Sequence, residues 1–293
     1  MKQCVFLTME DLSDFVAYDH LLYEPLAALG WEVVNVPWTA DVDWTKYDAV
    51  VIRSPWDYQK QPSRFLNVLQ EIEACGVPLF NSADVCRWNL DKRYLRELHE
   101  AGVGIIPTRW LDCLRPDDLC DLDDLGELWQ LGQHIVAKPW IGAGADDTFV
   151  LKQSDPATWV QAQQVYAAKP LMVQGFVQSI CDVGEYSLFY FGGAYSHAIL
   201  KRPKHGDFRV QEEHGGEISA TEPQSSHLEL AEQALNAVAQ QLLYARVDIV
   251  HLADGSPAVI ELELIEPSLY FPFDPDSPDR FAKAFCAMIE RIC

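Results

Sequence analysis

The sequence has few basic residues and no long apolar run. Only 22 of its 293 residues are Lys or Arg, against 44 Asp or Glu, which gives a formal net charge of −22. A chain this acidic is repelled by phosphate backbones and by anionic lipids, so its composition argues against nucleic-acid and membrane partners. Nowhere do about 20 uncharged apolar residues run together, so we expect no transmembrane helix.

Cysteines at metal-binding spacing are also absent. The eight cysteines are scattered, with no CxxC motif and no Cys/His spacing typical of a zinc site. With 49% hydrophobic residues, a chain of this length can build its cores without disulfides. The N-terminal segment turns acidic after a few apolar residues and lacks the apolar core of a signal peptide. We therefore expect a cytoplasmic protein with reduced thiols.

The first part of the chain alternates short apolar runs with amphipathic helical stretches. In chain order these segments are Gln3–Thr8, Asp19–Leu29, Trp31–Pro37, Tyr47–Arg53, Pro62–Cys75 and Val77–Phe80. Alternation of this kind predicts a parallel sheet, in which ligands bind beyond the carboxyl ends of the strands. The segment from Arg53 to Tyr58 directly follows the apolar run Ala49–Ile52, and its Arg53 and Asp57 are candidate substrate contacts. The alternative is a solvated loop in which Trp56 covers the sheet edge.

Farther along, the pattern changes to antiparallel β-structure. Charged amphipathic helices are predicted over Asn89–Ala101 and His227–Leu243, and an extended piece over Val103–Pro107. The apolar runs typical of strands are His134–Pro139, Thr148–Lys152, Leu171–Val177, Tyr186–Phe191 and Ala194–Lys201. Gly192-Gly193 joins the last two runs and is typical of a two-residue hairpin turn.

A second hairpin is predicted near the C-terminus. Ala245–His251 and Ser256–Ile265 flank Asp254-Gly255, a dipeptide suited to a two-residue type I′ turn. With that loop, Asp248 lies opposite Glu261.

The same register places Arg246 opposite Glu263, on the same face as the first pair. The apolar face of this hairpin is predicted to consist of Val247, Ile249, Ile260, Leu262 and Leu264. Three carboxylates on one patch of sheet are hard oxygen ligands of the type that suits Mg²⁺. The alternative is an exposed polar face on an edge hairpin.

One lysine stands in an apolar strand before a glycine-rich loop. Lys138 lies within Ile135–Pro139, and the segment from Gly142 to Thr148 follows. Small residues let backbone N–H groups approach phosphate oxygens closely. The segment matches neither the P-loop nor the dinucleotide-binding fingerprint, so on its own it also fits a simple hairpin turn. Lys92, taken alone, reads as a solvated helix lysine.

Taken in this order, the segments resemble the ATP-grasp ligases, in the branch that includes bacterial glutathione synthetase and the ribosomal-protein glutamate ligases. The resemblance implies an α/β protein with an ATP-grasp fold, preceded by a Rossmann-like parallel-sheet domain. It implies domains at residues 1–85, 86–175 and 176–293, the second carrying a glycine lid and the third the metal-binding hairpin. It also implies ATP and Mg²⁺ as cofactors and a homodimer.

The resemblance further assigns residues to the nucleotide. Lys92, in Asn89-Leu90-Asp91-Lys92, and Lys138 match the two nucleotide lysines of the family, and the loop from Gly142 to Gly144 matches its flexible lid. The adenine-binding hinge is similar to Gln174-Gly175-Phe176-Val177. Glu185 takes the place of an Asp that holds the ribose hydroxyls in the family.

Other residues match the phosphate and metal sites of the family. Arg209, which precedes Gly215-Gly216, resembles the arginine near the transferred phosphate, and with Lys138 and Arg246 it is a predicted catalytic residue. Asp248, Glu261 and Glu263 fall where the family has its metal-binding acids, and Glu263 replaces an Asn that is common in the relatives.

Two segments are similar to a narrower group that includes the O-ureidoserine cyclo-ligase of cycloserine biosynthesis. One runs from Arg53 to Tyr58, and the other contains Glu266 and Ser268, which are predicted substrate contacts. This likeness does not transfer a substrate, because pocket residues diverge faster than the nucleotide site.

The activity implied by the resemblance is ATP-dependent ligation of a small-molecule carboxylate to an amine. Transfer of the γ-phosphoryl group would give an acylphosphate, and attack by the amine would release phosphate beside ADP. Two alternatives stay open. One is an intramolecular cyclo-ligase of the O-ureidoserine type, and the other is a nucleotide-binding protein without catalysis.

Overall fold

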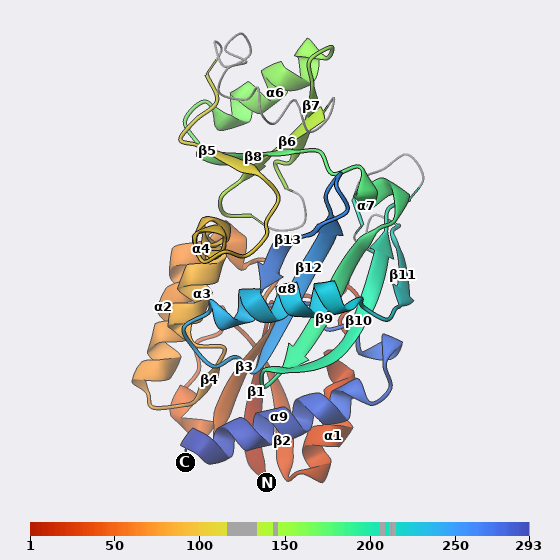
Figure 1. Cartoon of the computed structure of the whole chain (residues 1–293). Coiled ribbons are helices and arrows are strands. Elements are labelled where there is room, and N and C mark those ends of the chain that lie inside the picture. Colours follow the sequence, from red (N-terminus) through yellow and green to blue (C-terminus); the bar gives the residue numbers. More distant parts are fainter. Residues whose placement is uncertain (116–133, 143–145, 205–208, 211, 213–214, 293) are drawn as a thin grey trace.

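The structure, a computed structural model, describes residues 1–115, 134–142, 146–204, 209–210, 212 and 215–292. Its described strands form three sheets, which Figure 1 shows one above another. The sheet that contains β1 lies at one end, and the sheet that contains β6 lies at the other. None of the described helices is both long enough and apolar enough to cross a bilayer.

The N-terminal sheet is parallel, as the alternating pattern predicts. Its order is β2-β1-β3-β4, with β1 (Lys2–Thr8), β2 (Trp31–Pro37), β3 (Ala49–Ser54) and β4 (Leu79–Phe80). The α-helices between these strands are α1 (Tyr23–Ala28) and α2 (Pro62–Ala74). All six residues of β3 are buried, as expected for a central parallel strand.

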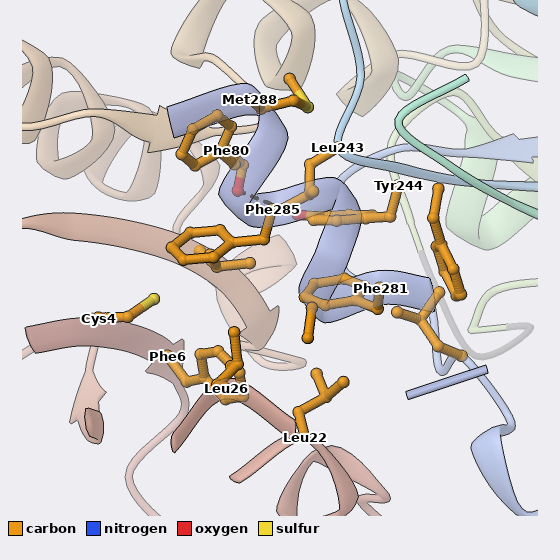
Figure 2. Packing of buried hydrophobic residues seen from close by; sticks show 14 of the residues in the cluster. Cys4, Phe6, Leu22, Leu26, Phe80, Leu243, Tyr244, Phe281, Phe285 and Met288 are labelled. Atoms are coloured by element: carbon orange, nitrogen blue, oxygen red, sulfur yellow. Dashed lines mark hydrogen bonds between the residues drawn. The ribbon is translucent and has the colours of Figure 1, made fainter. Parts of the chain in front are cut away.

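The C-terminal helix α9 (Ser277–Ile292) packs back onto the N-terminal sheet. Phe281 and Phe285 of this helix share one apolar cluster with Cys4 and Phe6 of β1 (Figure 2). Tyr244, from the next sheet, belongs to the same cluster. The two ends of the chain therefore share one core.

The middle sheet is antiparallel, in the order β11-β10-β9-β12-β13. Its strands are β9 (Glu185–Phe191), β10 (Ala194–Arg202), β11 (Glu217–Ala220), β12 (Tyr244–His251) and β13 (Pro257–Glu263). Helix α8 (Ser225–Asn236) packs on this sheet through Leu230 and Ala231. The helix ends at Asn236, seven residues before its predicted end at Leu243. A turn and bends begin at residue 237 and lead into β12.

The third sheet has the order β5-β8-β6-β7 and is also antiparallel. Its strands are β5 (Thr108–Leu111), β6 (His134–Pro139), β7 (Phe149–Lys152) and β8 (Leu171–Gly175). Helix α6 (Pro156–Tyr166) covers it, with Trp159 and Tyr166 buried. A short helix, α7 (Ser179–Asp182), follows β8. The sequence pattern missed β5, which follows the predicted extended piece.

The helix predicted over Asn89–Ala101 is two helices, α3 (Ala83–Leu90) and α4 (Tyr94–Glu100). The break falls at Asp91, whose backbone is extended and whose carboxylate accepts a hydrogen bond from the Arg93 N–H. Lys92 therefore lies between two helices, and its N–H donates to the carbonyl of Trp140 at 2.8 Å. That contact ties Lys92 to the segment that follows β6.

The C-terminal hairpin has the predicted pairs, but its loop differs. Asp248 pairs with Glu261 and Arg246 with Glu263. Gly255 has φ of +85°, whereas Asp254 is not among the non-glycine residues with positive φ. The hydrogen bonds join Leu252 to both Gly255 and Ser256, which makes a three-residue loop in place of a type I′ turn.

A β-bulge restores the register beyond this loop. His251 pairs with Pro257 and Ile249 with Val259, and the register then shifts between Ile249 and Asp248. The extra residue on the second strand is Ile260, which lines a cavity, while Val259 belongs to the core. The prediction that Ile260 lies on the core face was therefore wrong, although the acid pairs beyond it were right.

Candidate active site

A cavity of about 840 Å³ is lined by residues of the middle and third sheets and by the segments that follow β1 and β3 of the N-terminal sheet. The predicted site residues on its wall are Lys92, Lys138, Gly142, Gln174, Gly175, Phe176, Val177, Glu185, Arg209, Arg246, Asp248, Glu261, Glu263, Asp57, Glu266 and Ser268. Gly144 lies outside the described residues. Segments that are distant in the sequence thus meet around one space large enough for a nucleotide and a small substrate.

Three carboxylates stand together on the β12–β13 hairpin. Asp248, Glu261 and Glu263 each offer an oxygen, and these atoms lie within 4.8 Å of one another. The free edge of β13 is held from outside, because the side chain of Asn89 pairs with the backbone of Leu262 and Leu264 at 2.7 and 2.8 Å. This support fixes the positions of the two glutamates.

Each of these three acids contacts a cation. Arg246 donates to Asp248 at 2.9 Å and also to Glu263, while Lys92 donates to Glu261. Burial opposes ionisation of Asp248, but Arg246 and Lys201 outweigh it and hold its pKa at about 2. Burial raises the pKa of Glu263 to about 7, an effect that Arg246 offsets only in part.

Lys201 is a buried member of this cluster that the sequence reasoning missed. Its ammonium lies 2.5 Å from Glu185 and 3.5 Å from Asp248. Gly184 allows its own backbone to pack closely against that of Lys201, because a Cβ at position 184 would lie 2.6 Å from the carbonyl oxygen of Lys201. The only signal in the sequence was a basic residue near the end of an apolar run, which by itself is typical of a strand terminus.

The two predicted nucleotide lysines lie close enough to influence each other. Lys138 projects from β6, and burial together with the charge of Lys92 lowers its pKa to about 8. Burial opposes the charge of Lys92, yet the neighbouring Glu261 raises its pKa. Gly142 makes a tight turn after β6, since a Cβ there would lie 2.8 Å from the ring of Pro139.

The predicted adenine hinge lies at the end of β8. Gln174 is buried, with its amide donating to Thr108 Oγ1 at 2.9 Å. The Phe176 N–H donates to the carbonyl of His134 at 3.0 Å. Gly175 and Val177 line the cavity on either side of Phe176.

Arg53 does not line the cavity, in contrast to its prediction as a substrate contact. Its guanidinium is 1% exposed, pairs with Asp19 at 2.9 Å and donates to the carbonyl of Pro267 at 3.1 Å. It also lies 5.2 Å from the centre of the Tyr244 ring. The guanidinium thus binds groups of the protein itself, and it connects β3 to the segment that follows β13.

The loop after β3 forms another part of the cavity wall. Asp57 accepts a hydrogen bond from Trp38 Nε1 at 2.7 Å, and Trp56 Nε1 donates to the carbonyl of Glu266 at 3.0 Å. The phenol of Tyr58 is close enough to the carboxyl group of Glu266 to favour its ionised form. Burial, followed by repulsion from Glu263, raises the pKa of Glu266 to about 8.

Comparison with known proteins gives two family matches along the chain. Residues 4–81 match the family described as "D-cycloserine synthetase DcsG, N-terminal domain". Residues 117–262 match "Prokaryotic glutathione synthetase, ATP-grasp domain". These matches confirm the family resemblance predicted from the lysines, the hinge and the acidic hairpin.

Individual relatives agree with the two matches. The cycloserine biosynthesis protein DcsG of Streptomyces lavendulae is 32% identical over 261 residues, which cover 85% of this chain and 86% of that protein. The crystal structure of D-cycloserine synthetase DcsG superposes with a TM-score of 0.83 at 30% identity, covering 99% of this chain and 100% of the other.

A more distant structure shares the fold. D-alanine–D-alanine ligase from Bacillus anthracis, complexed with ATP, has a TM-score of 0.71 at 15% identity, covering 100% of this chain and 98% of that one. The alternative of a nucleotide-binding protein without catalysis is set aside, because both family matches and the DcsG structure are of synthetases. The chain belongs to the ATP-grasp ligase family, in the group that has a DcsG-type N-terminal domain, and is an ATP-dependent ligase that forms C–N bonds.

Proposed function

We propose that the protein phosphorylates the carboxylate of a small molecule with ATP and joins the resulting acylphosphate to a nitrogen nucleophile. The observation that supports this proposal most strongly is the position of Asp248, Glu261 and Glu263 beside two lysines in one cavity. A carboxylate does not condense with an amine at neutral pH, because oxide is a poor leaving group. Conversion to an acylphosphate supplies phosphate as the leaving group.

Mg²⁺ fits the acidic triad by the chemistry of its donors. Three carboxylate oxygens within 4.8 Å are hard ligands that leave room for water and phosphate oxygens in the metal's coordination shell. When bound there, Mg²⁺ would neutralise charge on the phosphoryl oxygens. Arg246 now neutralises part of the same triad and would keep Asp248 and Glu263 in place as the metal enters.

The remaining residues of the nucleotide half act by binding and orientation. Lys92 and Lys138 would hold the phosphates, and Arg209 would stabilise the transferred phosphoryl group. The backbone from Gln174 to Val177 would pair with the adenine edge, and Glu185 would hold the ribose hydroxyls. The loop that begins at Gly142 would exclude water from the acylphosphate.

The substrate half would be formed by the N-terminal domain and by the segment that follows β13. Asp57, Glu266 and Ser268 line this part of the cavity and would contact the substrate. Arg53 would act indirectly, by fixing Pro267 between Glu266 and Ser268. We further propose a cytoplasmic homodimer that takes a small-molecule carboxylate and an amine.

A second candidate, intramolecular ligation, is favoured by the N-terminal match. Residues 4–81 match the N-terminal domain of D-cycloserine synthetase, and this region supplies Trp56, Asp57 and Tyr58 to the cavity. In a cyclo-ligase of the O-ureidoserine type, nucleophile and acylphosphate would belong to one molecule. The mass of the product separates the two candidates.

The experiment that tests the proposal is carboxylate-dependent ADP formation with hydroxylamine as a trap. O-Ureidoserine and a panel of amino acids would be incubated with the protein, ATP and Mg²⁺, and acyl-hydroxamates would be detected by mass. A hydroxamate that requires ATP is the expected result. ATP hydrolysis that no carboxylate stimulates, with no hydroxamate from any acid tested, would contradict the proposal.

A further inference from the structure

Among the acids of the cavity wall, Glu266 has a different environment from those of the middle sheet. Asp248, Glu261, Glu263 and Glu185 each form an ion pair with Lys or Arg. Within the described part of the chain, Glu266 forms no ion pair, and the phenol of Tyr58 is close enough to its carboxyl group to favour the ionised form. A carboxylate without a counter-ion is free to take up a proton.

The backbone around Glu266 is held on both sides. Trp56 Nε1 donates to the carbonyl of Glu266 at 3.0 Å, and the guanidinium of Arg53 donates to the carbonyl of Pro267 at 3.1 Å. The buried phenol of Tyr58, which is 7% exposed, lies near the carboxyl group itself. Glu266 therefore has a defined position, and little of its conformational entropy would be lost when substrate binds.

Glu266 lines the same cavity as the proposed metal and phosphate sites. Glu263, Glu261 and Lys92 are close enough to influence its ionisation, and all three belong to the proposed metal and phosphate sites. Glu266 also lines the same cavity as Asp57 and Ser268, on the proposed substrate side. Glu266 is therefore in the cavity where we propose that the activated carboxylate and the nucleophile meet.

We infer that Glu266 is the general base of the second half-reaction, an assignment that rests on the proposed function. The nitrogen attacks the acyl carbon and a C–N bond forms. Glu266 accepts the proton that the nitrogen loses, and the C–O bond to phosphate breaks, so that phosphate leaves with the electron pair. Tyr58 keeps the carboxylate aimed at the nitrogen.

The raised pKa of Glu266 agrees with this role. Burial and the neighbouring Glu263 raise it to about 8, so the carboxylate holds a proton more strongly than an ordinary glutamate does. A base is most effective when its pKa lies near the working pH. The four acids with cation partners are poorer candidates, because taking up a proton would break an ion pair.

The test separates the two half-reactions in Glu266→Gln. Hydroxylamine is nucleophilic without a base, so hydroxamate formation from O-ureidoserine or an amino acid reports activation of the carboxylate alone. Formation of the ligated or cyclised product from the same acid reports both steps. We expect Glu266→Gln to form hydroxamate at the parental rate and to lose product formation by roughly 100-fold or more.

Two further variants keep the test decisive. Tyr58→Phe removes the hydroxyl that orients Glu266 but keeps the ring, and should lower product formation less than Glu266→Gln while sparing the hydroxamate. Asp14→Asn removes an exposed carboxylate from another part of the cavity lining and should leave both rates unchanged. The ATP-induced shift of the melting temperature shows whether each variant is folded.

The outcomes distinguish this inference from the proposed function. Equal loss of hydroxamate and product in folded Glu266→Gln would overturn the role as base and place the residue in carboxylate binding or activation. Unchanged product formation would also overturn it. If the parent protein itself forms no hydroxamate with any acid, the proposed function fails, and the role of Glu266 falls with it.

Discussion

Two walls of the same cavity balance their charges differently. On the wall formed by the middle sheet, every predicted metal-binding acid contacts a cation, and Arg246, Lys92 and Lys201 provide those contacts. On the wall formed by the N-terminal domain and the segment after β13, Asp57 accepts a hydrogen bond from Trp38, and Glu266 lies near the phenol of Tyr58. We propose that the first wall exchanges its cations for Mg²⁺, whereas on the second wall Glu266 accepts a proton.

This difference has a direct physical consequence in the pKa values. Cations hold the pKa of Asp248 at about 2, although burial opposes its ionisation, while burial without a counter-ion raises that of Glu266 to about 8. The pKa values of two carboxyl groups in one cavity are thus shifted in opposite directions, because their neighbours differ. We therefore associate the first wall with binding of charge and the second with proton transfer.

The largest effect on activity is expected from Glu261→Gln. This change removes one charged ligand from the acidic triad and should lower turnover by about 10³-fold or more, because charge on the transferred phosphoryl group loses its stabilisation. Magnesium-dependent ADP formation measures the effect, and thermal unfolding shows that the fold is kept. Parental turnover with unchanged magnesium dependence would remove Glu261 from the metal site.

The next effect should appear in stability, in Arg53→Met. Removal of this guanidinium leaves Asp19 buried without a counter-ion and should cost about 3–5 kcal/mol of unfolding free energy, measured with urea. Arg96→Met, which breaks the exposed Arg96–Glu100 pair, is the matched control and should cost about 0.5 kcal/mol or less. Equal stability in both variants, with weaker substrate binding only in Arg53→Met, would restore Arg53 as a substrate contact.

A smaller effect is expected from Lys138→Ala. Loss of this ammonium should weaken ATP binding by about tenfold, which corresponds to about 1.4 kcal/mol. The measurement is the shift of the melting temperature by ATP, compared with the parent protein at equal nucleotide concentration. If ATP shifts both proteins equally, Lys138 does not hold the nucleotide.

A further effect concerns stability against pH, measured without nucleotide or metal. Because the pKa of Glu266 is raised in the folded state, the native protein binds more protons than the unfolded chain between about pH 5 and 8, so stability falls as pH rises through that range. Asp248 has the opposite sign, and its contribution is lost as pH falls toward 2. Glu266→Gln should flatten the fall above pH 5, and an unchanged slope would contradict the assigned pKa.

Much of this architecture could be predicted because hydrophobic period and turn chemistry are local. β2 and β6 have the predicted bounds, since their apolar runs end at clear breaks. The pairing of Asp248 with Glu261 was also predicted, but only because two departures from the predicted hairpin cancel each other. The real loop is longer by one residue, and the bulge at Ile260 moves the register back by one.

The same kind of bulge explains why Lys201 was missed. A two-residue loop at Gly192-Gly193 pairs Glu185 with Leu200 by simple counting. The register shift between Tyr195 and His197 moves Lys201 opposite Glu185 instead. No turn residue in the sequence marks such a shift, because its cause is packing against the rest of the fold.

Arg53 shows another limit of sequence reasoning. Arg53 was predicted to follow a parallel strand, but it lies within β3 near the carboxyl end, the edge that faces ligands in such sheets. Its partner Asp19 lies 34 residues earlier, and the carbonyl of Pro267 lies 214 residues later. Tertiary partners at those separations leave no local pattern, so the direction of the side chain could not be read from the segment itself.

The central assignment is tested most directly by a crystal structure with a non-hydrolysable ATP analogue and Mn²⁺ in place of Mg²⁺. The predicted result is an anomalous peak among Asp248, Glu261 and Glu263, with Lys92 and Lys138 on the phosphates and Lys92 released from Glu261. A Mn²⁺ peak elsewhere, or phosphates out of reach of both lysines, would contradict it.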